Sequence, residues 1–243
     1  MSEKREKYRG LFTVLEGPDG SGKLTQATCL QEEVQRLSKY ADVIRTHEPW
    51  RSKEIKEKLK KDRDSFSDGA RMAELYIDDR VKHTKHLIRP VLEAGSIALC
   101  DRYKMSTCAY QWVQGVELHE LLRLHEERGI LTPDITFLLQ INLETFRKRV
   151  EERGGELEKF ERNTEFIGKL INAYAALGYM AQVDEGIFGK VTIIDGNRKK
   201  EDIAREIKEK FVPYYERWAG QNLATNLSPG TITIINETLI DSA

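Results

Sequence analysis

The glycine-rich segment 17–25 constrains the fold more than any other part of this 243-residue chain. It reads Gly-Pro-Asp-Gly-Ser-Gly-Lys-Leu-Thr and lies between an apolar run, 11–16, and a segment, 23–40, whose apolar residues recur at helical spacing. A buried strand, a glycine loop and a helix in this order are typical of a phosphate-binding loop. Glycines let successive backbone N–H groups surround an anion, and the helix N-terminus adds partial positive charge. The segment therefore predicts an α/β domain that binds a phosphate-bearing ligand.

Short apolar runs and helical patterns alternate along the rest of the chain. Further strands are expected at 41–49, 96–101, 134–141 and 190–195. Further helices are expected at 52–61, 68–93, 106–113, 117–128, 143–153, 163–180 and 200–218, with Pro90 as a kink or near-end marker in the second of them. This alternation predicts an α/β fold in which a five-stranded parallel sheet is flanked by helices on both faces.

The composition changes after Trp218, where Asn, Thr and Ser become frequent. We therefore expect one domain over 1–218 and a C-terminal extension over 219–243. The extension is either a loop with an edge strand near 231–235 or a loose tail, and the sequence does not decide between them.

The charge balance excludes some partners. The chain has 39 Lys+Arg and 40 Asp+Glu, a formal net charge of -1, so no global field favours nucleic acid or an anionic membrane. No apolar run approaches the length that spans a bilayer, and no apolar stretch of the signal-peptide kind follows the charged start. A cytoplasmic location is therefore expected.

The loop departs from the usual pattern at one position. Lys23 is expected to reach the β- and γ-phosphates of ATP, and the next residue is normally Ser or Thr, whose hydroxyl holds Mg²⁺. Here that residue is Leu24, and Thr25 lies about 100° further round the helix. Either Mg²⁺ is held by ATP oxygens, water and a carboxylate such as Asp101, or the site is partly degenerate and turns over slowly. The predicted nucleotide contacts are Gly17, Asp19, Gly20, Ser21, Gly22, Lys23, Leu24 and Thr25.

Several further motifs occur in a fixed order. They are Glu16-Gly17-Pro18-Asp19-Gly20, His47-Glu48-Pro49, Tyr76 four residues before Arg80, the block Asp101-Arg102-Tyr103 with Ser106, Ala109, Tyr110 and Gln111, then Pro133-Asp134 and a basic segment over about 143–161. From about residue 11 to 218, this series resembles the thymidylate kinases, P-loop nucleoside monophosphate kinases that transfer the γ-phosphoryl group of ATP to dTMP. The Asp-Arg-Tyr block is the most specific part of the resemblance.

The resemblance implies roles on the acceptor side. Arg102 would bind the acceptor phosphate, which its planar guanidinium suits, and Asp19 would lie near the sugar hydroxyl. Tyr76 would stack on thymine, and Arg80 would bond the carbonyl edge of the base. The acceptor set implied by the resemblance is Asp19, Glu48, Tyr76, Arg80, Arg102, Ser106, Tyr110 and Gln111. A structural interpretation stays open for several of them: an arginine paired with a carboxylate for Arg102, a turn former for Asp19, a packed aromatic with an apolar-stemmed arginine for Tyr76 and Arg80, and a turn cap for Gln111.

The resemblance also implies a basic lid and a metal ligand. Arg149 and Arg153 would fold over ATP, with Gly154-Gly155 as a hinge, unless the charge run is only a solvated helix face. Asp101 would be the carboxylate on the Mg²⁺ side, or else a helix cap. The expected catalytic residues are Lys23, Asp101, Arg102, Arg149 and Arg153. The family usually forms homodimers, and ATP and Mg²⁺ are its cofactors.

Two substitutions bear on the acceptor. His47 stands where the family usually has arginine, and Trp50 stands where glycine often follows Glu-Pro. Together with Leu24, these residues leave three hypotheses: a dTMP kinase with an unusual Mg²⁺ site, a kinase of the same fold for another nucleoside monophosphate or nucleoside, and a nucleotide-binding protein that has lost catalysis.

Overall fold

The computed structural model describes residues 10–226 apart from 63, 155, 158 and 185. Its strands form one sheet in the order β2-β3-β1-β4-β5, and all four pairings are parallel. The strands are β1 (Leu11–Glu16), β2 (Val43–His47), β3 (Ile97–Asp101), β4 (Ile135–Gln140) and β5 (Lys190–Asp195). The predicted five-stranded parallel sheet is confirmed.

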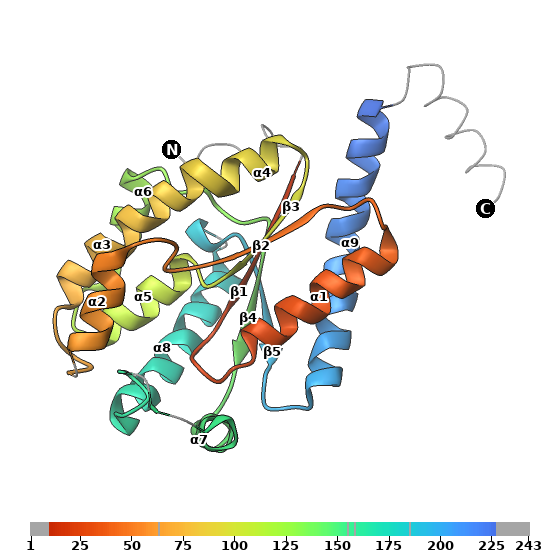
Figure 1. Cartoon of the computed structure of the whole chain (residues 1–243). Coiled ribbons are helices and arrows are strands. Elements are labelled where there is room, and N and C mark those ends of the chain that lie inside the picture. The colour runs from red at the N-terminus through yellow and green to blue at the C-terminus, as the bar shows by residue number, and fades with distance from the viewer. Residues whose placement is uncertain (1–9, 63, 155, 158, 185, 227–243) are drawn as a thin grey trace.

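Helices connect the strands and cover both faces of the sheet (Figure 1). They are α1 (Lys23–Leu37), α2 (Lys53–Lys61), α3 (Gly69–His83), α4 (Arg89–Glu93), α5 (Lys104–Val113), α6 (Leu118–Glu127), α7 (Leu143–Arg153), α8 (Thr164–Val183) and α9 (Lys200–Asn226), with the short helices η2 (Thr84–Ile88) and η3 (Gly186–Phe188). The hydroxyl of Ser52 accepts a hydrogen bond from the Ile55 amide and caps α2.

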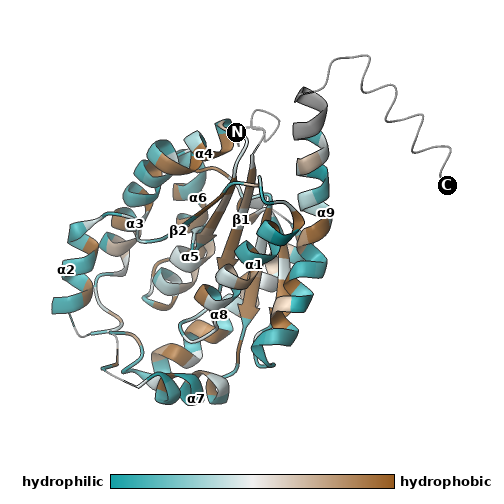
Figure 2. Cartoon of the chain, turned by 45° about the vertical axis from the view of Figure 1, so that its right-hand side comes forward, coloured by the Kyte–Doolittle hydropathy of each residue, from teal (hydrophilic) through white to brown (hydrophobic). Residues whose placement is uncertain are grey.

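Alternate residues of each strand face opposite helical layers. Leu11 and Leu15 of β1 pack with α1 and α9, whereas Phe12 and Val14 pack with residues of α3, η2 and α4. A further cluster joins α5 and α8 over the sheet end that contains β4 and β5. Figure 2 shows the hydrophobic strands in the centre, enclosed by helices with hydrophilic outward faces, such as α2 and α7.

The strand order places the candidate site. In β1, Leu15 is level with Asp101 of β3, and Glu16 is level with Leu138 of β4. The loops that leave the carboxyl ends of these strands therefore open at one edge. That edge is where open α/β sheets bind ligands.

Two predicted helices differ more than the others from the structure. The segment 68–93 is not one helix, because the π-helical turn Thr84–Ile88 separates α3 from α4. Pro90 has no N–H to donate to the preceding turn, so the helix is rewound ahead of it. The last helix continues beyond Trp218 to Asn226. The possible strand at 231–235 lies outside the described residues. Within the described part of the chain, no helix is both long and apolar enough to cross a bilayer.

Candidate active site

The segment between β1 and α1 forms a loop with glycines in the left-handed region. Gly17, Gly20 and Gly22 have φ values of 140°, 73° and 93°, which other residues rarely adopt. At Gly17 a Cβ would lie 2.5 Å from the carbonyl oxygen of Leu139, so a side chain does not fit. The hydroxyl oxygen of Ser21 is buried and has no hydrogen-bond partner in the described part of the chain. A bound phosphate would supply that partner.

Lys23 lies within this loop. Its side chain is buried, and Nζ donates hydrogen bonds to the carbonyl oxygens of Gly17 (2.9 Å) and Pro18 (2.8 Å). Burial and the charge of Arg102 lower the pKa of Lys23 to about 8, although the carboxylates of Asp101 and Asp19 act in the opposite direction. The ammonium is thus confined to the loop, close to the Arg102 guanidinium, and both cationic groups could neutralise phosphate charge.

Arg102 follows the end of β3 in a left-handed conformation, with φ 67°. Its guanidinium forms an ion pair with Asp19 and lies 3.4 Å from the Tyr110 hydroxyl, which itself donates to Asp19 at 2.7 Å. Burial raises the pKa of Asp19, but the charges of Arg102 and Lys23 and the bond from Tyr110 outweigh it, leaving the pKa at about 2. The open alternative, an arginine paired with a carboxylate, is therefore found, and the pair lines a pocket.

This first pocket has a volume of about 650 Å³. All eight acceptor residues expected from the sequence line it. Around the rest of its wall are residues of the lid segment, including Leu157, Lys159 and Phe160. Tyr76, on α3, presents a half-buried ring, and burial raises the pKa of its phenol to about 12, so the ring stays neutral. We call this space the acceptor pocket.

Gln111 is fully buried in the wall of the acceptor pocket. Its amide Nε2 donates to the Gln114 Oε1 atom at 2.9 Å. Its own Oε1 is buried without a hydrogen-bond partner in the described residues. An unpaired buried acceptor is costly, so an N–H group of a ligand that reached this oxygen would gain a favourable hydrogen bond.

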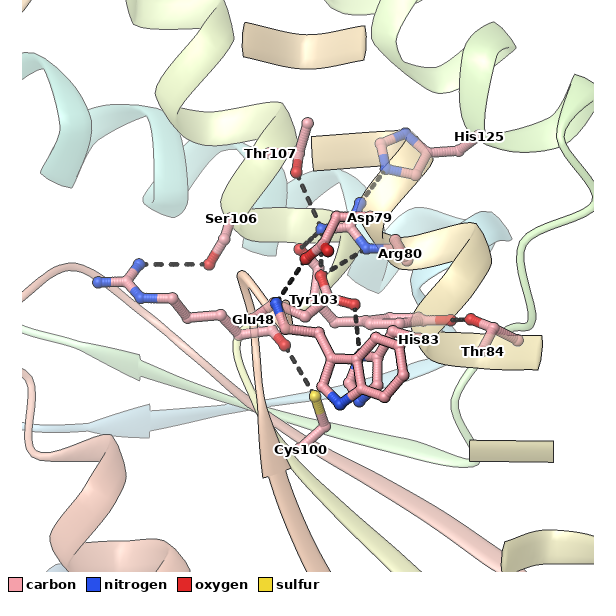
Figure 3. Close-up of polar contacts among 12 residues, drawn as sticks. Glu48, Asp79, Arg80, His83, Thr84, Cys100, Tyr103, Ser106, Thr107 and His125 are labelled. Carbon is pink, nitrogen blue, oxygen red and sulfur yellow. Dashed lines mark hydrogen bonds and ion pairs between the residues drawn. The ribbon is translucent and has the colours of Figure 1, made fainter. Parts of the chain in front are cut away.

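Arg80 is held from several sides, as Figure 3 shows. Glu48 Oε2 accepts a hydrogen bond from Nε at 2.7 Å and lies 2.6 Å from Nη2 in an ion pair. Nη2 also donates to the Tyr103 carbonyl (2.8 Å) and the Thr107 hydroxyl (2.9 Å), and Nη1 donates to His125 Nε2 (2.6 Å). Arg80 is only 1% exposed. The guanidinium therefore has a fixed orientation in the wall of the pocket.

The imidazole of His125 is neutral in this arrangement. Its Nδ1 donates to the Leu121 carbonyl at 2.6 Å, which leaves Nε2 as the acceptor that Arg80 requires. Burial and the charge of Arg80 hold the pKa of His125 well below its ordinary value. No local pattern in the sequence marks His125, because α6 brings this residue to Arg80 only in the folded chain.

His83 bonds one carboxylate oxygen of Glu48, and Arg80 bonds the other. Its Nδ1 donates to Glu48 Oε1 at 3.0 Å, and its Nε2 lies 2.8 Å from the Thr46 hydroxyl. The Trp50 ring stacks on the imidazole at 5.2 Å. Trp50, one of the two departures on the acceptor side, thus covers this buried ion-pair network and is absent from the lining of the acceptor pocket.

Glu16 joins β1 to α5. Its carboxylate accepts hydrogen bonds from the Tyr103 amide (2.8 Å), the Ser106 amide (3.1 Å) and the Ser106 hydroxyl (2.5 Å). The Ser106 hydroxyl also lies 2.8 Å from the hydroxyl of Tyr174. Ser106 therefore lines the pocket while bonded to the framework, and Glu16 positions the block that carries Arg102.

A second pocket, of about 580 Å³, has Ser21, Gly22 and Thr25 in its lining. Arg149 of α7 reaches across it. Its Nη1 donates to the carbonyls of Gly20 (3.0 Å) and Ser21 (3.1 Å), and its Nη2 donates to the Gly196 carbonyl (2.6 Å). We call this space the donor pocket.

Leu24 and Thr25 differ in their positions. Leu24 is 64% exposed and is absent from the donor-pocket lining, whereas Thr25 belongs to that lining. The hydroxyl that the loop pattern requires is therefore missing at its usual place.

Arg153 does not join the other expected catalytic residues. Its guanidinium forms a two-pronged ion pair with Glu161, at 2.9 Å and 2.7 Å, and it lines neither the acceptor nor the donor pocket. The pair spans the predicted hinge and ties the end of α7 to the following segment.

Asp101 is the candidate metal ligand. Its Oδ1 is buried with no hydrogen-bond partner in the described part of the chain, and α5 begins after Tyr103 without a side-chain cap, so the helix-cap alternative is not found. The described residues contain no group of three or more potential metal ligands. Mg²⁺ is commonly held by one or two carboxylates together with substrate phosphates, and the unpartnered oxygen fits that mode.

Comparisons of this chain with a family model and with individual known proteins indicate the same family. A family model described as thymidylate kinase matches residues 15–207. A probable thymidylate kinase from Pyrococcus abyssi is 33% identical over 207 residues, which cover 82% of this chain and 94% of that protein. Thymidylate kinases from Leifsonia xyli subsp. xyli (36% over 207 residues; 82% and 93% covered) and Desulfotalea psychrophila (36% over 174 residues; 70% and 83% covered) are also similar.

Proposed function

Because the chain belongs to the thymidylate kinase family and is thus a nucleoside monophosphate kinase, we propose that it transfers the γ-phosphoryl group of ATP to dTMP, with Mg²⁺. The observation that carries this proposal is the gathering of the eight acceptor residues around one pocket beside the phosphate loop. A homodimer and a cytoplasmic location are parts of the same proposal, which rest on the family resemblance and the composition.

The base of the acceptor would be recognised by its hydrogen-bonding edge. Gln111 offers an unpartnered acceptor to the N3–H group of thymine, and Arg80 offers the neighbouring carbonyl the second N–H of Nη1, beside the one bonded to His125. Cytosine has the opposite pattern at both positions, since its N3 accepts and its amino group donates. Tyr76 supplies an aromatic face for stacking.

The reacting phosphates would lie between the two pockets. Arg102 binds the acceptor phosphate, Lys23 binds the β- and γ-phosphates, and Arg149 neutralises charge from the donor side. An oxygen of the acceptor phosphate attacks the γ-phosphorus, and the bond to the β-phosphate oxygen breaks, so that ADP leaves. Asp101 would hold Mg²⁺, which supplies charge neutralisation on the phosphate oxygens.

The proposal is tested by identifying the product. Protein incubated with ATP, Mg²⁺ and dTMP should yield equal amounts of ADP and dTDP on anion-exchange chromatography. ADP without dTDP would show hydrolysis instead of transfer and would contradict the proposal.

The metal site leads to a prediction for Leu24. We expect Leu24→Thr to lower the Mg²⁺ concentration needed for half-maximal ATP binding by about fivefold, because one added oxygen contact contributes ~1 kcal/mol. The measurement is a Mg²⁺ titration at a fixed ATP concentration, with binding detected by calorimetry. Leu24→Val is the matched control, since it has the shape of threonine without the hydroxyl. An equal shift in both variants would mean that shape, and not the hydroxyl, matters.

The pKa of Lys23 leads to a prediction for pH. Phosphate binds the ammonium form, and free Lys23 loses its proton near pH 8. Affinity for ATP should therefore be constant below pH 8 and fall above it, by up to about tenfold per pH unit until the proton is also lost from the complex. Lys23→Arg, whose guanidinium stays charged, should lack this fall. An identical pH profile for both proteins would assign the titration to another group.

A further inference from the structure

The orientation of the Gln111 amide decides which pyrimidine the acceptor pocket can accept. With Oε1 toward the ligand, the pocket offers an acceptor, which suits the N3–H of thymine or uracil. With Nε2 toward the ligand, it offers a donor, which suits the N3 of cytosine. A glutamine amide can be reversed by rotation, so the selectivity depends on whatever fixes it.

Gln114 provides the contact that fixes this amide. Gln114 Nε2 donates to two backbone carbonyls, those of Ser65 and Ser67, each at 3.0 Å. A carbonyl oxygen can only accept, so the Gln114 amide nitrogen must face this pair. The Gln114 Oε1 atom therefore faces Gln111. Because this oxygen only accepts, Gln111 must donate to it with its Nε2, at 2.9 Å. The unpartnered Oε1 of Gln111 is what remains.

The surrounding packing holds Gln114 in place. The first residue of α3 is Gly69, where a Cβ would lie 2.7 Å from the Cβ of Gln114, so the start of α3 and the turn after α5 approach too closely for a side chain at position 69. The Ser65 hydroxyl donates to the Lys159 carbonyl at 3.1 Å, which connects the carbonyl-bearing loop to the lid segment. Gln114 itself is absent from the pocket lining.

We propose that Gln114 is a positioning residue that makes the acceptor pocket selective for a pyrimidine with an N3–H group. It does not touch the ligand and acts through Gln111. Arg80, held by Glu48 and His125 (Figure 3), presents the matching donor. This inference rests on the proposed function only in taking a pyrimidine nucleotide as the occupant of the pocket.

The test is equilibrium binding of dTMP and dCMP, measured by calorimetry without ATP, so that it does not depend on phosphoryl transfer. Wild-type protein should bind dTMP at least about 100-fold more tightly than dCMP. Gln114→Met, which keeps length but offers no amide, should lower this ratio by about tenfold or more, because the Gln111 amide is then free to reverse.

Two further variants separate positioning from a loss of folding. Gln114→Glu keeps an oxygen for Gln111 Nε2 and should retain the wild-type ratio, even if its melting temperature falls. Gln182→Met removes a comparable partly buried bond, from Nε2 to the Val191 carbonyl at 2.9 Å, outside both pockets, and should leave the ratio unchanged.

Each outcome decides the inference. An unchanged dTMP to dCMP ratio in Gln114→Met, or an equal loss in Gln114→Glu, would overturn it. So would a wild-type protein that binds the two nucleotides equally or binds neither. Selective binding of dTMP that is lost in Gln114→Met, but without dTDP formation by the wild type, would support the inference while contradicting the proposed function.

Discussion

Replacement of Lys23 by alanine is expected to lower kcat for dTDP formation by about 10²- to 10³-fold, the usual effect of removing a donor that stabilises charge in the transition state. Nζ is buried inside the phosphate loop and bonded to the carbonyls of Gly17 and Pro18. Those bonds keep the ammonium at the point where the β- and γ-phosphates would lie. Steady-state rates at saturating ATP and dTMP measure the effect.

The control for this variant is Lys82→Ala. Lys82 is an exposed lysine of α3 that lines neither pocket, so its loss changes the net charge equally without touching the site. We expect wild-type kinetics from it. A Lys23→Ala protein with more than a tenth of wild-type kcat would show that the loop lysine does not carry the charge stabilisation assigned to it.

Replacement of Arg102 by alanine is expected to raise the KM for dTMP by about 30-fold or more, with little change in the KM for ATP. Loss of one member of a charge-assisted contact commonly costs ~2 kcal/mol or more. Asp19 adds to the effect, because removal of Arg102 leaves the Asp19 carboxylate without its ion-pair partner beside the acceptor phosphate.

A double substitution separates these two contributions. If Asp19 repels the phosphate once Arg102 is absent, Asp19→Asn combined with Arg102→Ala should bind dTMP more tightly than Arg102→Ala alone. Arg102→Lys should recover only part of the affinity, since it keeps the charge and loses the planar pair of donors. Wild-type KM for dTMP in Arg102→Ala would exclude this arginine from the acceptor site.

Much of the fold follows from local sequence patterns. The strand 11–16 is followed by glycines and a helix-period segment, and this order alone predicts the strand, the loop and the first helix. The π-helical turn at 84–88 was not predictable in detail, because Pro90 indicates that a helix is disturbed without specifying how the preceding turn is rewound.

The sequence predicted some residues of the candidate site and did not indicate others. Arg102, Tyr76 and Gln111 belong to a motif or a helical spacing that a single sequence displays, and the fold brings them to one pocket. His125 and Gln114 act through other side chains and depend on contacts between separate segments, so no local pattern marks them. Arg153 differs from both groups. Its basic lid pattern predicted a site residue, but in the folded chain it is paired with Glu161 and lines neither pocket.

The most direct test of the central claim is a coupled ADP-release assay with ATP, Mg²⁺ and a panel of nucleoside monophosphates. We expect rapid turnover with dTMP, slower turnover with dUMP, which has the same hydrogen-bonding edge, and almost none with dCMP or purine nucleotides. Preferred turnover of dCMP or a purine nucleotide would contradict the assignment of the acceptor pocket. ATP binding without turnover of any acceptor would contradict the kinase activity itself.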